Sequence, residues 1–129
     1  EMSDSGVIEI QNHSYDLHKN NRTRQGIRKN NGEDMESYRK MLSSDVLLLQ
    51  GKCRSHLGVV PTTFTYPFGF GAKDAQSILK ECGFVATLSC AEGVSLVTKG
   101  DPNSLWNLKR YNRPHQVDRT RFFAKLSEN

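Results

Sequence analysis

The chain has 129 residues, of which 36% are hydrophobic and 25% charged, and a formal net charge of +4. This length allows one domain that buries about two-thirds of its unfolded surface, and no stretch approaches the roughly 18 consecutive apolar residues of a membrane-spanning helix. Its three cysteines lack a Cys-x-x-Cys spacing, which argues against a disulfide framework or a structural zinc knuckle.

Residues 7–11 have the pattern of a short buried strand, because Val7, Ile8 and Ile10 are β-branched and turn residues flank them. His13 and His18 follow at the carboxyl end, where α/β folds usually place ligands and catalytic groups. A five-residue step turns an α-helix roughly 140° past one full rotation, so the two rings would not share a helix face. A loop could fold both onto one metal ion. Taken alone, the spacing is weak evidence for a metal site, because paired histidines near strand ends are also found as hydrogen-bonded packing residues and as exposed loop residues.

A basic segment comes next. Between Lys19 and Lys29 the sequence has five basic residues and no acidic one. A solvated loop and a surface attracting an anionic cell-wall polymer are both consistent with this pattern. Binding of nucleic acid is disfavoured, because no aromatic residues interleave with these charges.

Residues 33–57 predict a long amphipathic helix, with Asn31 or Asp34 as its N-cap and Gly58 at its end. Apolar residues recur at three- and four-residue steps on its buried face: Tyr38, Leu42, Val46, Leu49, Cys53 and Leu57.

A strand over 59–66 follows, and then a turn over 67–71 that its proline and glycines require. A second helix is predicted over 73–81, ended by Gly83, and a strand over 84–89. The side chains predicted to be buried by the second helix are Ala75, Ile78, Leu79 and Cys82.

Residues 91–103 are polar and predict a surface connection, which a last strand over 106–111 follows. Asp118 is a suitable N-cap for a closing helix with Phe122, Phe123 and Leu126 facing inward. The alternation of strands and helices predicts an α/β fold with mainly parallel strands and helices outside.

Three segments together resemble the polysaccharide deacetylases of carbohydrate esterase family 4. Residues 9–18 resemble the family's His-Ser/Thr motif, in the variant whose second His comes five residues after the first, typical of the branch acting on poly-N-acetylglucosamine. Residues 64–69, Phe-Thr-Tyr-Pro-Phe-Gly, are similar to the third motif, and residues 108–114 resemble the family's end. The resemblance implies that residues 1–129 form one partial domain, the C-terminal portion of a distorted (β/α) barrel.

The resemblance implies a metal-dependent hydrolase that cleaves linear amide C–N bonds, removing N-acetyl groups from N-acetylglucosamine units of a cell-surface or cell-wall polysaccharide. It assigns His13 and His18 as ligands of a divalent metal, with Zn²⁺ expected. The family's third ligand and its general base are Asp residues of an upstream motif that this sequence lacks. The chain alone is therefore expected to be inactive or nearly so. Asn12, Ser14 and Asp16 are candidates to hydrogen-bond the two imidazoles.

For catalysis, the resemblance assigns the backbone N–H of Phe68 as an oxyanion donor. Thr65 stands where the family commonly has an Arg that orients the base, and Arg110 is either its substitute or a structural ion-pair partner. Tyr66 and Pro67 are assigned to substrate binding. The ring of Tyr66 suits stacking on a sugar and equally suits a packed turn aromatic.

Partners and location follow from the same resemblance. The expected partner is a polysaccharide substrate, with no nucleic acid and no membrane span, at an extracellular or cell-surface location. An exposed edge of the strand over 7–11 implies self-association into a homo-oligomer. His115 is the one late candidate for a general acid, although Pro114-His115 suits a surface turn better. The alternative function is a non-catalytic carbohydrate-binding or structural module of the same fold.

Overall fold

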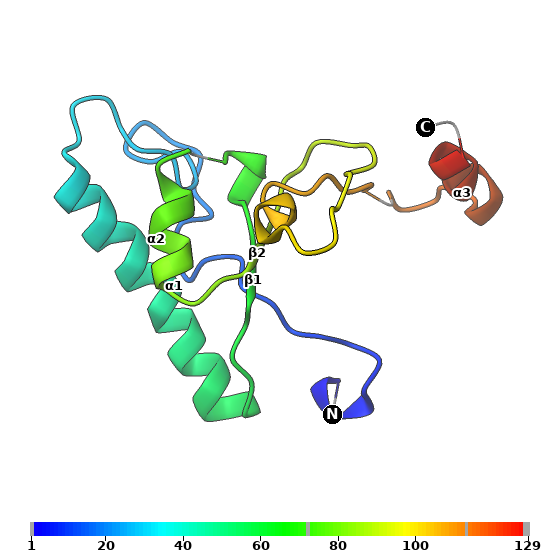
Figure 1. Cartoon of the computed structure of the whole chain (residues 1–129), viewed down its shortest axis with the longest axis horizontal. Helices are drawn as coiled ribbons and strands as arrows, with labels where there is room; N and C mark the ends of the chain where they lie inside the picture. Colours follow the sequence, from blue (N-terminus) through cyan, green and yellow to red (C-terminus); the bar gives the residue numbers. More distant parts are fainter. Residues whose placement is uncertain (1, 72, 113, 128–129) are drawn as a thin grey trace.

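The computed structural model describes residues 2–71, 73–112 and 114–127. Figure 1 shows the arrangement of its helices and strands. In chain order these elements are η1 (Ser3–Ser5), α1 (Met35–Leu57), β1 (Thr63–Thr65), η2 (Pro67–Gly69), α2 (Ala75–Glu81), β2 (Ala86–Leu88), η3 (Pro102–Leu105) and α3 (Arg119–Ser127).

The strands are short and parallel. β1 pairs with β2 in the register Thr63 to Ala86 and Thr65 to Leu88. Single parallel bridges extend this pair on both sides, from Asn12 to Phe64 and from Leu88 to Leu108. The spatial order is therefore Asn12, β1, β2, Leu108, with α1 and α2 in the first two connections. This confirms the predicted α/β fold with parallel strands and helices outside.

The prediction of a strand over 7–11 is wrong, because these residues form no strand and only Asn12, which follows them, pairs with β1. The side-chain oxygen of Gln11 accepts hydrogen bonds from the backbone N–H groups of Thr62 and Thr63, at 3.0 and 2.8 Å. A side chain thus satisfies donors that a longer ladder would have used. Val7 is 86% exposed, so the segment is not buried either.

α1 confirms the predicted long helix and begins two residues later than expected. Asp34 is the N-cap, its carboxylate accepting from the N–H of Ser37 at 2.8 Å, and Gly58 ends the helix at φ 69°. Its buried face carries Tyr38, Leu42, Val46, Gln50 and Cys53. Gln50, not the predicted Leu49, is buried there, because its amide donates to the carbonyl of Pro61.

The core lies between α1, α2 and the sheet. α1 and α2 pack against each other (Figure 1), and β1 contributes Phe64, which is fully buried. Ala75, Ile78 and Leu79 of α2 are buried as predicted, whereas Cys82 is half-buried. Each fully buried Leu or Ile side chain adds about 1.5–3 kcal/mol to stability, so these helices fix the sheet below the site.

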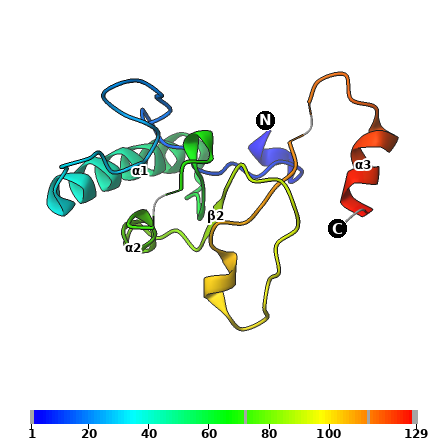
Figure 2. The same ribbon diagram turned by 90° about the horizontal axis from the view of Figure 1, so that it is seen from above.

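The closing strand and helix differ most from expectation. The strand predicted over 106–111 is reduced to the bridge at Leu108. α3 begins after Asp118 as predicted, but Phe123 is 50% and Leu126 38% exposed. The reason is that α3 stands apart from α1, α2 and the sheet, as Figure 2 shows, so its apolar side chains have no core to face.

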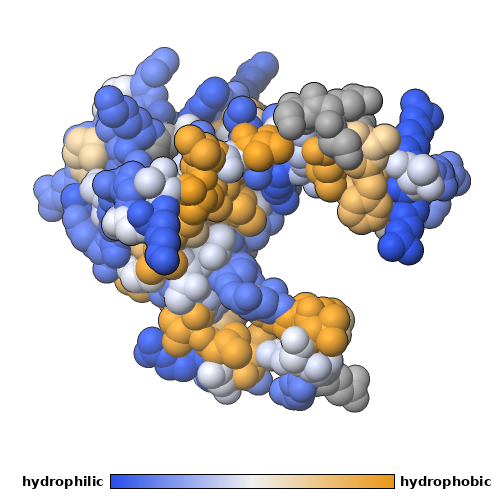
Figure 3. Space-filling view, turned by 45° about the vertical axis from the view of Figure 1, so that its right-hand side comes forward, coloured by the Kyte–Doolittle hydropathy of each residue, from blue (hydrophilic) through white to orange (hydrophobic). Residues whose placement is uncertain are grey.

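Two arms of the molecule leave a broad hollow between them. The space-filling view in Figure 3 shows hydrophobic surface on both arms, which carry the N-terminal segment and α3. Exposed Met2, Val7 and Ile8 belong to the first arm, and Phe123 and Leu126 to the second. Among the described residues, no helix has the length and hydrophobicity needed to cross a bilayer.

Candidate functional site

The predicted site residues gather at one edge of the sheet. His13 follows Asn12, Tyr66 to Phe68 follow β1, and Arg110 follows Leu108. Because parallel strands place their carboxyl ends at the same edge, residues from three distant segments converge there. The parallel topology of the strands therefore brings the site residues together.

His13 and His18 lie side by side, with ring centroids 4.9 Å apart and ring planes at 63°. His13 Nδ1 is 2.8 Å from the carbonyl oxygen of Thr65. A carbonyl oxygen only accepts hydrogen bonds, so Nδ1 carries the hydrogen and the neutral ring keeps its lone pair on Nε2. This tautomer leaves Nε2 of His13 available as a metal ligand.

The loop that carries both histidines is tied to α1. Asn12 is fully buried and donates through its amide to the carbonyl of Val46, while its side-chain oxygen accepts from Ser14 N–H. The carboxylate of Asp45 accepts from the N–H groups of Tyr15 and Asp16, at 2.8 and 2.7 Å. The loop is therefore held by the helix that follows it in sequence.

Asn12, Ser14 and Asp16, the candidates for hydrogen bonds to the two imidazoles, bond to other groups in the structure. Asn12 and Ser14 bond to backbone groups, with Ser14 Oγ accepting from Leu17 N–H. Asp16 pairs with Lys19 at 2.6 Å. Thr65, which the sequence suggested only as a departure from the family motif, supplies the contact to His13 through its backbone.

The turn after β1 brings Phe68 to the histidines. Its ring lies 4.1 Å from that of His18, and its backbone is left-handed at φ 56°. Within the part of the chain that the structure describes, no hydrogen bond uses the N–H of Phe68. Among the described residues the group is therefore a donor without an acceptor, as an oxyanion donor must be before substrate binds.

Gly69 positions this turn against β2. Its φ is 69°, and a Cβ placed there would lie 2.6 Å from Cβ of Cys90. The close approach brings the segment after β2 beside the turn. Arg110 joins the same place, because its Nε donates to the Ser89 carbonyl at 2.8 Å and its Nη2 lies 3.1 Å from Sγ of Cys90.

Arg110 pairs with no carboxylate among the described residues. Cys90 lies between Arg110 and the Phe68–Gly69 turn, because its Sγ is close to the Arg110 guanidinium and its Cβ to Gly69. The predicted role of Arg110 in orienting a catalytic carboxylate stays a prediction. The structure shows that the Arg110 side chain hydrogen-bonds to the carbonyl of Ser89, the residue that follows β2.

Tyr66 and Pro67 are both buried in this chain. Tyr66 is 4% exposed, its ring packs edge-on to that of Phe64 with centroids 5.9 Å apart, and burial raises the pKa of its phenol. One side of it lines a cavity of about 380 Å³ together with Gly71 and Asn107. Substrate binding by these two residues therefore stays a prediction.

The two imidazoles fit a divalent metal as part of a ligand set. Neutral imidazole nitrogen suits zinc, and the Thr65 carbonyl orients His13 as carboxylates and carbonyls do for zinc-bound histidines. Among the described residues, no group of three or more His, Cys, Asp or Glu side chains could hold a metal. The pair thus needs further ligands.

The remaining histidine candidate lies elsewhere. His115 is exposed in a turn, in agreement with the interpretation as a surface turn; the neighbouring Arg113 of that motif lies outside the described residues.

Asp45 and Cys90 are the residues that sequence reasoning missed. Asp45 lies in the middle of a helix, and Cys90 looked like one of three unrelated thiols. Each acts through contacts with residues about 20 to 30 positions away, and no local pattern signals such contacts.

Sequence comparison identifies one family. Residues 1–87 match the sequence model of the family described as polysaccharide deacetylase. No curated protein matches the chain.

Three solved structures share the fold. A de-N-acetylase from Aggregatibacter actinomycetemcomitans superposes over 97% of this chain and 50% of its own, with a TM-score of 0.72 and 18% identity. IcaB from Ammonifex degensii covers 86% of this chain and 44% of its own, with TM-score 0.66 and 21% identity. The BpsB deacetylase domain from Bordetella bronchiseptica covers 84% and 44%, with TM-score 0.64 and 20% identity. The chain thus spans half or less of the length of these structures.

Proposed function

The chain belongs to the polysaccharide deacetylase family, and from this membership we propose that it carries the paired-histidine part of the metal site of a de-N-acetylase. The substrate proposed is a polysaccharide with N-acetylglucosamine units, at the cell surface or outside the cell. The similarity to the fold of three proteins described as deacetylases or as IcaB supports this proposal.

The observation that carries the proposal is the contact between His13 and His18, with Nδ1 of His13 occupied by the Thr65 carbonyl. Both rings stand at the carboxyl edge of the sheet, where Nε2 of His13 can face a divalent ion. Bound zinc would supply a Lewis acid for the attacking water and the amide carbonyl. The histidines would hold and orient that ion.

Phe68 is proposed to stabilise the negative charge that develops on the amide oxygen. Its N–H has no acceptor among the described residues, and its ring touches His18 at 4.1 Å. A preorganised backbone donor of this kind contributes about 2.7–4 kcal/mol to transition-state stabilisation. Arg110 is proposed to orient the carboxylate of a general base, which the family carries in a motif that this sequence lacks.

The proposal is tested first by zinc binding, measured by isothermal titration calorimetry on the chain. We expect His13→Ala and His18→Ala each to weaken zinc binding roughly tenfold or more. His56→Ala, at the exposed end of α1, is the matched control and should bind as the unchanged chain does. Equal zinc affinity in all four proteins would refute the assignment of the pair.

Activity is tested separately, by acetate release from N-acetylglucosamine oligosaccharides. We expect little or no release by the chain alone, because it lacks the family's Asp base. Addition of a polypeptide carrying the family's Asp motif should restore release. Robust acetate release by the chain alone would contradict this part of the proposal, whereas sugar binding without release in the mixture would favour the carbohydrate-binding module.

A further inference from the structure

Residues 19–31 form a hydrogen-bonded loop beside the site. Arg24 makes two hydrogen bonds to the Glu33 carboxylate, at 2.8 and 3.1 Å, and both side chains are about 85% buried. Ile27 is fully buried, and its carbonyl accepts from the Tyr38 hydroxyl at 2.7 Å. The side-chain oxygen of Asn21 accepts from two backbone N–H groups. These contacts give the loop a defined shape.

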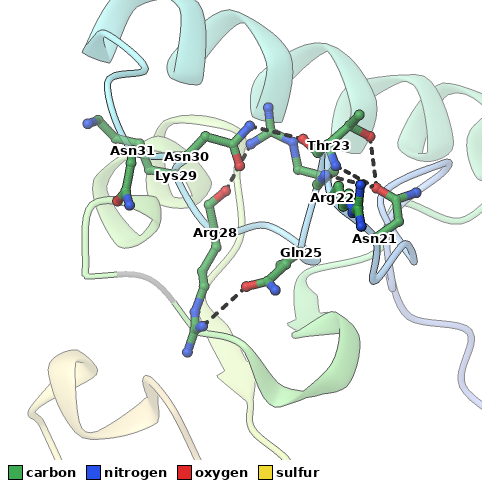
Figure 4. Close-up of a pocket in the computed structure, with 9 residues that line it drawn as sticks. Asn21, Arg22, Thr23, Gln25, Arg28, Lys29, Asn30 and Asn31 are labelled. Atoms are coloured by element: carbon green, nitrogen blue, oxygen red, sulfur yellow. Dashed lines mark hydrogen bonds between the residues drawn. The ribbon is translucent and has the colours of Figure 1, made fainter.

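The loop surrounds a hollow of about 600 Å³ with positive charge (Figure 4). Glu33 pairs with Arg24 and attracts the more distant Lys29 electrostatically. The side chains of Arg22 and Lys29 make no hydrogen bond or salt bridge to any other described residue, and the Arg28 guanidinium hydrogen-bonds only to the neutral side chain of Gln25. The other lining residues are mostly amides and a hydroxyl: Asn21, Thr23, Gln25, Asn30 and Asn31. Among the described residues, three cationic side chains without a salt bridge to a carboxylate therefore share one polar hollow.

A continuous line of ring contacts connects this hollow to the histidine pair. The guanidinium of Arg28 lies 4.6 Å from the centre of the Phe70 ring. Phe70 lies 5.8 Å from Phe68, and Phe68 lies 4.1 Å from His18. Gly26 of the loop also abuts the carbonyl of Pro67, where a Cβ would lie at 2.9 Å. The loop and the turn after β1 are thus packed as one unit.

From this arrangement we infer that the loop over 19–31 is a subsite for anionic substituents, carboxylate or phosphate, on the polysaccharide whose sugars reach His13 and His18. The inference rests on the proposed function. The three cations that lack a salt bridge attract the charge, and the amides can donate to and accept from sugar hydroxyls. Phe68 and Phe70 provide the apolar surface between the two sites.

Nucleic acid is the less suitable polyanion. Single-stranded nucleic acid is held by aromatic side chains interleaved with basic ones, and residues 19–31 contain no aromatic residue. The aromatic residues that border the loop instead lead to the histidine pair.

The test measures binding of charged oligosaccharides to the chain by calorimetry at about 0.1 M salt, where charges more than about 10 Å apart are screened. The probes are hexagalacturonate for carboxylate, a phosphorylated oligosaccharide for phosphate, and neutral N-acetylglucosamine hexamer. We expect one charged oligosaccharide or both to bind more tightly than the neutral one. Equal or weaker binding of both charged probes would overturn the inference.

The double variant Arg22→Gln with Lys29→Gln removes two charges without removing a hydrogen bond or salt bridge among the described residues. It should weaken binding of the charged probe roughly fivefold. The matched control, Arg54→Gln with Lys99→Gln, makes the same change in net charge at exposed positions outside the loop and should have no such effect. Equal effects of the two double variants would show general charge attraction and overturn the subsite.

Two further measurements distinguish the subsite from a nucleic-acid site and from the metal site. A single-stranded oligonucleotide of equal charge should bind more weakly than the charged oligosaccharide, and tighter binding of the oligonucleotide would overturn the assignment. Zinc binding by the Arg22 and Lys29 double variant should be unchanged. His13→Ala should lose zinc binding and keep its binding of the charged oligosaccharide. Because zinc and oligosaccharide binding are measured separately, failure of the subsite is distinguishable from failure of the metal site.

Discussion

At Gly69, backbone conformation and close packing both require glycine. Its φ of +69° disfavours any residue with a Cβ, and the Cβ of Cys90 occupies the space that a side chain would need. Gly6 has the same φ of +69°, but among the described residues no atom beyond its two chain neighbours lies within 4 Å of the position that its Cβ would take. The two glycines thus share one backbone cost and differ in packing.

We expect Gly69→Ala to lower the free energy of unfolding by about 2–5 kcal/mol, combining a left-handed backbone with overpacking. Gly6→Ala should cost about 1–2 kcal/mol, from the backbone alone. Urea denaturation measures both. Equal losses in the two variants would mean that the contact between Gly69 and Cys90 contributes nothing.

Glu33 makes the stability of the loop depend on pH. Its hydrogen bonds from Arg24, and then from the Asn30 N–H, hold the pKa of its carboxyl below the ordinary value of 4.5. A lowered folded-state pKa means that the stabilisation is complete above pH 4.5 and is lost as the pH falls through the folded-state pKa.

Glu33→Gln should therefore lower the free energy of unfolding at pH 7 by about 1–3 kcal/mol, since Arg24 loses its charged partner. The gap between the variant and the unchanged chain should narrow as the pH falls below 4.5. Denaturation at pH 7 and at pH 3.5 measures it, with the exposed Glu36→Gln as the charge control at pH 7. A gap of constant size would contradict the role of the ionised carboxylate.

Some of the site could be predicted at the level of single residues. The spacing of His13 and His18 after a strand-like segment indicated a loop that brings them together, and their rings are in contact. The Thr65 carbonyl could not be predicted, because every residue has one and only the fold selects which points at a histidine. Long-range bonds between a side chain and the backbone leave no trace in local pattern.

Among the elements, α1 could be predicted closely, while the strands could not. A capping Asp34, a closing Gly58 and a regular apolar face all act within the helix itself. The length of a strand depends instead on its neighbours. Residues 7–11 are apolar enough for a strand, but only Asn12 pairs with β1, and the Gln11 side chain takes the next donors.

Asp45 links two elements, because its carboxylate on α1 holds the loop that carries the histidines. We expect Asp45→Ala to lower stability by about 1–3 kcal/mol and zinc affinity roughly tenfold, as for groups that orient metal ligands. Hydrogen exchange at the amides of Tyr15 and Asp16 should become faster. Calorimetry and exchange measurements check these outcomes.

Ser44→Ala, at the exposed neighbouring position on α1, is the matched control. It should leave zinc affinity and the exchange of both amides unchanged. If Asp45→Ala leaves them unchanged as well, the hydrogen bonds do not position the histidine loop.

At the scale of the whole molecule, the main feature is the exposed apolar surface on its two arms. The sheet order, with helices in its first two connections, followed from the alternation of patterns along the sequence. The position of α3 could not be predicted, because an amphipathic pattern predicts that one face of a helix is buried but does not identify the surface that covers it. Exposed Phe123 and Leu126, with Val7 and Ile8 on the other arm, leave apolar surface on both sides of the hollow.

The arm with Val7 and Ile8 also borders the sheet edge at Asn12. Among the described residues, nothing pairs with this edge on the side away from β1. Asn12 itself is buried, but Val7 and Ile8 before it are 86% and 45% exposed. Exposed backbone with apolar side chains recruits further strands, so we expect the chain to self-associate in a concentration-dependent way, as sedimentation velocity would show. Val7→Lys with Ile8→Lys should shift the chain toward monomer, because lysines on an edge oppose pairing.

The matched control for this prediction is Val94→Lys with Leu96→Lys, at residues that are 60% and 90% exposed in the connection after β2. This pair adds the same charge at equally apolar positions away from the edge, so general repulsion between molecules would act in both variants, and edge pairing would be lost only in the first. A chain that stays monomeric at the highest attainable concentration would contradict the edge, and equal dissociation of both variants would transfer the effect from the edge to net charge.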